Sequence, residues 1–183
     1  MPRISYVDPD SAPEKVREAF ERIPPLNIFK TLAHAETAFR PFLRFGGAVL
    51  GQLALDPALR ELAILRVAQM ADAEYEWVQH VPIARQLGVS DAQIDALERE
   101  ELDADAFSDA ERAVLAFTAA VVRGPRVEDT LFGELTRHLP AREIVELLLT
   151  IGDYLMLARV MTVLELEVDE AAGGAVVDSV TRS

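Results

Sequence analysis

The stretch from Asp56 to Gly88 reads DPALRELAILRVAQMADAEYEWVQHVPIARQLG, and it predicts two helices joined by a short corner at residues 71–73. Asp56 followed by Pro57 is typical of a helix start, because an aspartate side chain can cap free backbone N–H groups and proline suits the first helical position. Gly88 is the expected end of the second helix. We expect the rest of the chain to pack around this pair of helices.

Three ionisable residues of this stretch are predicted to face the protein interior. At 100° per residue, Glu76 and His80 share the apolar face of the second helix, whereas Gln79 falls on the opposite side. Glu61 lies on the same side of the first helix as Leu65. Ionisable groups on an apolar face contradict simple hydrophobic patterning, and such contradictions are typical of functional sites.

A buried carboxylate is costly without a partner, so Glu61, Glu76 and His80 are expected to contact one another or a ligand. Burial raises the pKa of a carboxyl group, whereas a neighbouring imidazolium lowers it, and these opposed effects are typical of acid/base sites. The alternative that the pattern leaves open is a structural ion pair between two core helices.

The composition narrows the class of protein. The chain has 183 residues, half of them hydrophobic, which is enough for one domain, 1–183, with a sizeable core. Its net charge of −13 argues against nucleic acid or an anionic membrane as a partner. It contains no cysteine, so it forms no disulfide and has no thiol chemistry. The first ten residues hold no apolar run of signal-peptide length, which predicts a cytoplasmic protein.

The rest of the chain predicts further helices and no strand, because no stretch alternates apolar and polar residues between turn signals. Capping boxes are expected at Ser11, Ser90 and Ser108, each with Glu or Gln three residues later. The tail after Val168 is expected to be loosely held. The fold class is therefore predicted as all-α, with the remaining helices at 11–22, 27–33, 36–51, 90–100, 108–123, 127–138 and 141–166.

The last of these segments is the most apolar part of the chain. Glu146, Asp153 and Arg159 interrupt it, which argues for a buried helix and against a membrane span.

The spacing of the ionisable residues resembles that of the carboxymuconolactone decarboxylase and AhpD-like family. The redox branch of that family carries Glu, eleven residues, and then Cys-x-x-Cys-x-x-x-His. Here the same frame holds Glu61, eleven residues, Ala73, two residues, Glu76, three residues and His80. The segments RELAILRVA, HVPIARQLGVS and GDYLMLARVM also resemble the longer members, over about residues 40–165. The resemblance implies an AhpD-like helical bundle that assembles as a homo-oligomer.

The departure from the redox pattern changes the expected chemistry. Ala73 and Glu76 stand where the redox branch has its two thiols, so a disulfide-cycling peroxidase mechanism is disfavoured. Glu61 and His80 correspond to the proton-relay positions of that branch. The resemblance therefore implies that the relay is kept, and that Glu76 is a new chemical group.

The leading hypothesis is cofactor-free acid/base chemistry, of a lyase or decarboxylation-like type, on a small carboxylated or lactone substrate. In this interpretation His80 is the general acid or base, Glu61 orients it, and Glu76 is a second proton-transfer group. Arg159 is a candidate to bind an anionic substrate, or else pairs with Asp153 or Glu61.

Trp77 is a candidate wall of the substrate pocket, or else a packed core residue.

Two alternatives stay open from the sequence. Glu76 and His80 at i, i+4, with Glu61 from the adjacent helix, supply three possible metal ligands, although neither HExxH nor a paired Glu-x-x-His motif is present. The other alternative is a non-catalytic binding or scaffold protein, in which substitution of Glu76 or His80 alters stability alone.

Overall fold

The computed structural model describes residues 1–175 and 177, and this part of the chain is helical with no strand, so the all-α prediction is confirmed. A short 3-10 turn, η1 (Pro9–Ser11), precedes the helices. The helices are α1 (Glu14–Phe20), α2 (Asn27–Leu32), α3 (Glu36–Gly51), α4 (Pro57–Met70), α5 (Glu74–Gln86), α6 (Asp91–Glu98), α7 (Asp109–Arg123), α8 (Asp129–Leu135) and α9 (Ala141–Leu164).

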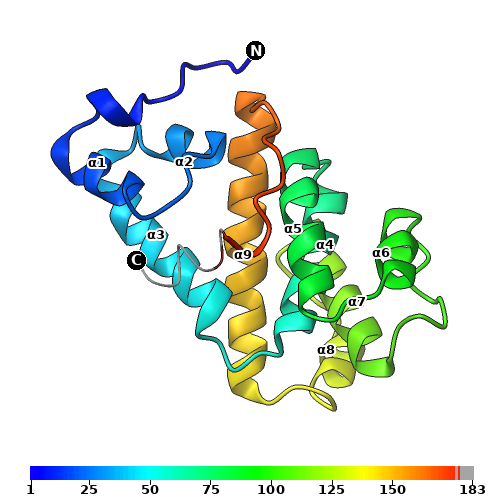
Figure 1. Ribbon diagram of the computed structural model, residues 1–183. Coiled ribbons are helices and arrows are strands. Elements are labelled where there is room, and N and C mark those ends of the chain that lie inside the picture. Colours follow the sequence, from blue (N-terminus) through cyan, green and yellow to red (C-terminus); the bar gives the residue numbers. More distant parts are fainter. Residues whose placement is uncertain (176, 178–183) are drawn as a thin grey trace.

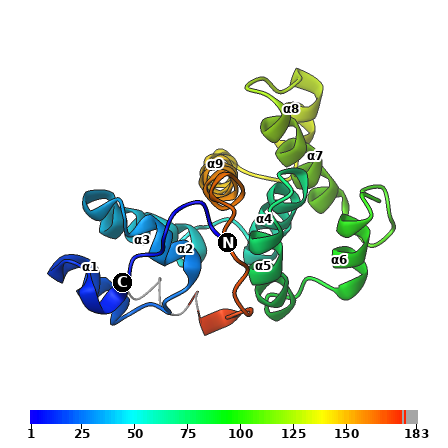
Figure 2. The ribbon, with the colours of Figure 1, turned by 90° about the horizontal axis from the view of Figure 1, so that it is seen from above.

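The helices are arranged around α9, which stands between two groups of helices (Figures 1 and 2). The helices α1 to α3 lie on one side of α9, and α4 and α5 lie on the other, with α6, α7 and α8 beyond them. The largest cluster of buried apolar side chains runs from Ala12 to Met161, so a single core joins both groups.

The helix α4 is buried on nearly all sides, as its sequence predicts, because α5, α7 and α9 all pack against it. Its side chains from Arg60 to Ala68 are all buried. A helix enclosed in this way holds any polar side chain it carries inside the protein.

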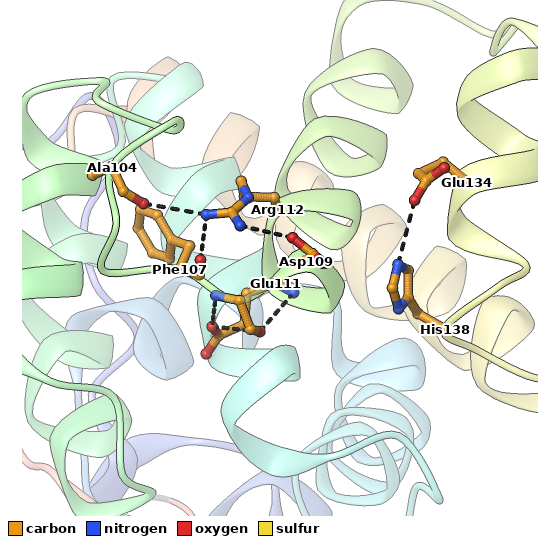
Figure 3. Close-up of polar contacts among 8 residues, drawn as sticks. Ala104, Phe107, Asp109, Glu111, Arg112, Glu134 and His138 are labelled. Carbon is orange, nitrogen blue, oxygen red and sulfur yellow. Dashed lines mark hydrogen bonds and ion pairs between the residues drawn. The ribbon is translucent and has the colours of Figure 1, made fainter.

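Local capping fixes where several helices begin. Asp56 accepts hydrogen bonds from the backbone N–H groups of Ala58 and Leu59, at 2.9 and 3.1 Å, and both predicted capping boxes at Ser90 and Ser108 are present. The start of α7 is held further by Arg112, which donates to the carbonyl oxygens of Ala104 and Phe107 and pairs with Asp109 (Figure 3). These contacts fasten the loop before α7 to the first turns of that helix.

The predicted capping box at Ser11 is wrong. Ser11 lies in η1, where its hydroxyl donates to the carbonyl oxygen of Asp8, and α1 begins at Glu14 without a side-chain cap. The aspartate Asp8 caps the 3-10 turn instead, accepting from the N–H of Asp10 at 3.1 Å. Asp8 and Ser11 lie three residues apart, and either side chain could cap a helix start. The sequence pattern favours Ser11, whereas the structure uses Asp8.

The face of α9 that points away from the core exposes several large apolar side chains: Val145, Leu148, Leu149, Met156 and Val163. By length and composition alone α9 could cross a membrane, but here it is the central helix and packs against α3, α4 and α7. The homo-oligomer implied by the family resemblance stays a prediction, and this exposed face is the surface that it would use.

Candidate acid/base site

Glu61 lies at the centre of the site and is completely buried. One carboxylate oxygen, Oε1, accepts from Nε and Nη2 of Arg60, at 3.1 and 2.9 Å. The other, Oε2, lies 2.8 Å from Nδ1 of His80. Arg60, Glu61 and His80 therefore form a buried chain that joins α4 to α5.

This chain determines how the imidazole of His80 is protonated. A carboxylate held by a guanidinium is an acceptor, so Nδ1 of His80 carries the proton that Glu61 receives in the hydrogen bond. Within residues 1–175 and 177, no hydrogen-bond partner is present for Nε2 of His80, which leaves its lone pair available. The ring of Tyr154 lies edge-on to the imidazole, with centroids 4.8 Å apart, and fixes its orientation from α9.

Glu76, one turn before His80 on α5, is 1% exposed. In the part of the chain that the structure describes, neither of its carboxyl oxygens has a hydrogen-bond partner. Burial raises the pKa of Glu76 well above its ordinary value, and the nearby Asp153 and Glu61 carboxylates raise it further. Burial therefore favours the protonated, neutral form of the Glu76 carboxyl group.

Asp153 on α9 is a second buried acid close to Glu76. It is 5% exposed, and its Oδ1 has no hydrogen-bond partner among the described residues. Burial raises the pKa of Asp153 to about 7. The two carboxyl groups therefore carry at least one proton between them near neutral pH.

These groups line a cavity of about 80 Å³ that lies between α2, α3, α5 and α9 and is partly open to solvent. Most of its lining is aliphatic or aromatic, and no lysine or arginine lines it within the described residues. The polar side chains that line it are Tyr75, Glu76, Gln79, His80, Asp153 and Tyr154. A mostly apolar cavity with a few convergent polar groups is typical of a small-molecule site.

The structure brings some of the predicted residues together and not others. Glu76 and His80 line the cavity, and Glu61 lies directly behind His80, as predicted. Trp77 does not line it: its indole is half-buried in a separate surface hollow between α4, α5 and α6. Arg159 is exposed on α9, lies outside the cavity and pairs with neither Asp153 nor Glu61.

The helical wheel placed Gln79 on the solvent side, and this is wrong, because Gln79 is buried by a part of the chain that follows α9. Residues 165–172, called here the strap, run back from the end of α9 beside α5 (Figure 1). The amide of Gln79 donates to the carbonyl oxygens of Asp169 and Glu170 and accepts from the N–H of Ala172, at 3.0 to 3.1 Å.

Asp169 fastens the strap to two walls of the cavity. Its carboxylate accepts from the hydroxyl of Tyr75 on α5 at 2.5 Å and from the N–H of Asn27 on α2 at 2.6 Å. Burial and the bond to Asp169 raise the pKa of Tyr75, which keeps its hydroxyl a donor. The prediction that the tail after Val168 is loosely held is therefore wrong up to residue 172, and residues 176 and 178–183 lie outside the described part.

Sequence reasoning missed Arg60, Tyr154 and the strap. Arg60 is adjacent to Glu61 in the chain and should point 100° away from it, but its long side chain turns back to the carboxylate. Arg60 could have been predicted, because a buried carboxylate such as Glu61 needs a cation nearby and its own helix face offers none. Tyr154 and the strap come from distant parts of the chain, and no local pattern marks them.

Comparison with known proteins supports the family that the sequence resembles. Residues 36–120 match the model of the carboxymuconolactone decarboxylase family. The uncharacterized protein YnjA of Escherichia coli (strain K12) is 34% identical over 100 residues, which is 54% of this chain and 54% of that protein, so the chain matches about half the length of this relative.

Solved structures share the fold over most of the chain. An uncharacterized peroxidase-related protein from Silicibacter sp. TM1040 has a TM-score of 0.80 and 20% identity, covering 92% of each chain. A cysteine-to-alanine variant of the debrominase Bmp8, in complex with 2,3,4-tribromopyrrole, has a TM-score of 0.76 and 20% identity, covering 97% of this chain and 96% of that one. At these identities the structures show a common fold and nothing about activity.

The family match over residues 36–120 and the shared all-helical fold support the carboxymuconolactone decarboxylase and AhpD-like family that the spacing around Glu61 and His80 predicted. Within that frame, a neutral carboxylic acid, Glu76, occupies the cavity together with the imidazole.

Replacement of Asp153 tests the electrostatics of the cavity. Because burial raises the pKa of Asp153 from 3.8 to about 7, the folded state retains a proton that the unfolded state releases, and the free energy of unfolding falls as the pH rises through this window. The side chain of Asp153→Asn does not titrate, so the free energy of unfolding of this variant does not fall for that reason. We expect the stability of the variant relative to wild type to rise by up to about 1.4 kcal/mol per pH unit between about pH 5 and 7, measured by urea unfolding.

The exposed Asp103 supplies the control, since Asp103→Asn should leave the pH dependence of wild type unchanged. A difference between Asp153→Asn and wild type that stays constant with pH would show that Asp153 is ionised in the folded protein as it is in the unfolded chain.

Removal of the Asp169 carboxylate tests the strap. Asp169→Ala leaves the Tyr75 hydroxyl and the Asn27 N–H without their acceptor, and a hydrogen bond to a charged group contributes about 1.5–3 kcal/mol. We expect amide hydrogen exchange in residues 165–172 to accelerate about tenfold or more, while exchange in α4 stays unchanged. Glu170→Ala is the matched control, because the side chain of Glu170 is exposed. Equal exchange in the two variants would show that Asp169 does not hold the strap.

Proposed function

We propose that this protein is a cofactor-free acid/base catalyst that transfers protons to and from a small, uncharged carbonyl or lactone compound in the cavity. The observation that supports it is the pairing, on one apolar cavity, of an oriented imidazole with a buried carboxylic acid whose oxygens have no protein partner within the described residues. Both proton-transfer groups are side chains, so the chemistry needs no cofactor.

His80 is suited to the role of base. Its Nδ1 is committed to Glu61, so Nε2 is the nitrogen that can take a proton from a substrate carbon. When Nε2 becomes protonated, the imidazolium lies beside the buried Glu61 carboxylate and is stabilised by it. Glu61 is a positioning residue in this mechanism, because it acts through His80, and Arg60 in turn holds Glu61.

Glu76 is suited to the role of acid. Its raised pKa keeps a proton on the carboxyl group, which can be donated to a substrate oxygen. Glu76 and His80 stand at i and i+4 on α5, and side chains at this spacing lie next to each other on a helix. A carbonyl group between them can therefore accept a proton at oxygen while the adjacent carbon loses one.

The proposed step is a balanced proton transfer. Nε2 of His80 removes a proton from the carbon next to the carbonyl, the C–H electron pair forms the C=C bond of an enol, and the carbonyl oxygen takes the proton of Glu76. Return of a proton from His80 to carbon, and of the enol proton to Glu76, restores both groups. General acid/base assistance of this kind contributes about 10² to 10⁴ in rate. A decarboxylation, the lyase-type reaction that the family resemblance implies, would in addition require a substrate carboxylate in this cavity.

The charge of the cavity favours an uncharged substrate over the carboxylated one expected from the sequence. No cationic side chain among the described residues lines the cavity, and Arg159 lies outside it. A substrate carboxylate would stand beside Glu76 and Asp153 without a counter-charge, and burying it there is costly.

Two other chemistries find less support. The chain contains no cysteine, so a thiol peroxidase mechanism is disfavoured whatever the names of its structural neighbours. The metal site built from Glu61, Glu76 and His80 is also disfavoured, because both oxygens of Glu61 are committed to Arg60 and His80. No group of three such residues within 1–175 and 177 is arranged to hold a metal ion.

Proton exchange at carbon tests this function without knowledge of the natural substrate. Cyclopentanone and γ-butyrolactone are incubated with the protein in D₂O, and deuterium incorporation next to the carbonyl is followed by NMR. We expect wild type to accelerate exchange, and His80→Asn and Glu76→Gln each to reduce the acceleration by about 100-fold or more.

Trp77→Phe is the control, because Trp77 lies outside the cavity and this variant should exchange at the wild-type rate. Melting temperatures of all four proteins separate lost chemistry from lost folding. Exchange by wild type that is no faster than by His80→Asn would overturn the proposal and favour the non-catalytic binding protein.

A further inference from the structure

The carboxyl group of Glu76 has an unusual environment for a buried acid. It is 1% exposed, it lines the cavity, and neither oxygen has a hydrogen-bond partner among the described residues. Buried polar atoms in folded proteins are nearly always paired, and an unpaired one costs stability. Two such atoms on one side chain that lines a cavity indicate that a bound molecule supplies the missing partners.

A neutral carboxyl group presents two complementary atoms side by side. Its hydroxyl donates one hydrogen bond and its carbonyl oxygen accepts another, and both lie in one plane. A ligand edge with an acceptor next to a donor, such as the C=O and N–H of a cyclic lactam, satisfies both at once. A lactone or a simple ketone satisfies the hydroxyl and leaves the carbonyl oxygen unpaired.

We propose that Glu76 is a two-point receptor for the polar edge of the ligand, and that the cavity takes small, uncharged ring compounds with a donor beside a carbonyl, as in lactams and enolised cyclic diketones. The inference rests on the proposed function in one respect, since it names the substrate class of the same cavity.

The cavity fits the rest of such a molecule. Its volume of about 80 Å³ is roughly half that of the ~150 Å³ engineered cavity that admits benzene, which restricts the ligand to a ring no larger than benzene. Apolar side chains of α2, α3 and α9, among them Phe29, Phe42 and Leu157, surround the space in front of Glu76 and would contact the ring carbons.

Other titratable groups surround Glu76, and any test must distinguish their effects on ligand binding from the effect of Glu76. Glu61, which is paired with Arg60, acts on it from α4, Asp153 and Tyr154 lie on α9, and His80 and Tyr75 lie on α5 itself. A change of binding with pH in wild type alone would not identify which of these groups is responsible. Substitution at Glu76 does.

The test is binding of four five-membered rings to the full-length protein, measured by NMR titration near pH 7. The rings are 2-pyrrolidinone, with donor and acceptor; γ-butyrolactone, with an acceptor alone; pyrrolidine, a cation; and cyclopentanecarboxylate, an anion. We expect 2-pyrrolidinone to bind about tenfold more tightly than γ-butyrolactone, because it makes one more buried hydrogen bond. Tightest binding of pyrrolidine or of cyclopentanecarboxylate would overturn the proposal.

Two substitutions at Glu76 sharpen the test. A glutamine side chain also presents an acceptor beside a donor, so Glu76→Gln should retain the preference for 2-pyrrolidinone and make it independent of pH. In wild type the affinity for both rings should fall as the Glu76 carboxyl group ionises, because a carboxylate has no hydrogen to donate to their carbonyl oxygens. Glu76→Met has neither atom and should bind the lactam and the lactone equally. A preference for the lactam that persists in Glu76→Met would contradict the assignment.

The binding and exchange experiments fail independently. A lactam preference that depends on Glu76, in a protein that catalyses no proton exchange, would support the receptor and overturn the catalytic function. Proton exchange by wild type without a lactam preference would support the catalyst and overturn the two-point receptor. Glu76→Gln is the most informative variant, since we expect it to bind the lactam and to lose the exchange activity.

Discussion

Glu61 is a completely buried carboxylate that accepts hydrogen bonds from Arg60 on one oxygen and from His80 on the other. The geometry of the site depends on these two contacts. Burying the charges of Arg60 and Glu61 is tolerable because each satisfies the other, and removing one partner of such a pair costs about 3–5 kcal/mol. The same carboxylate selects the tautomer of His80. The buried ion pair of Arg60 and Glu61 is therefore also the group that orients His80. From the sequence, a structural ion pair and an acid/base site were separate alternatives.

The rest of the site is built outward from this chain. His80 lines a cavity together with two acids, Glu76 and Asp153, whose pKa values are raised by burial. In the redox branch that the spacing resembles, a thiol stands at the position of Glu76. The substitution exchanges a group that donates electrons for one that donates a proton, while the positions of Glu61 and His80 are kept. The strap bound by Tyr75 and Gln79 then covers one wall of the cavity.

Much of this arrangement could be predicted from local pattern. The helical period of 100° correctly turned Glu61, Glu76 and His80 inward, and the capping boxes at Ser90 and Ser108 were recognisable from the sequence alone. The errors arose where distant segments decide the environment. Gln79 is polar and was placed toward solvent, but the strap buries it, and Arg159 interrupts an apolar helix yet lies on its exposed face. A helical wheel describes one helix and contains no information about what covers it.

The protonation of the His80 imidazole tests the central claim most directly. Nitrogen chemical shifts of the ring, measured by ¹⁵N NMR near neutral pH and assigned with His80→Asn, report which nitrogen carries the proton. If the buried Arg60–Glu61 pair orients His80, the neutral ring is protonated at Nδ1 and unprotonated at Nε2. A neutral ring protonated at Nε2 would contradict the account, because Glu61 would then not be accepting from His80 and no base would face the cavity.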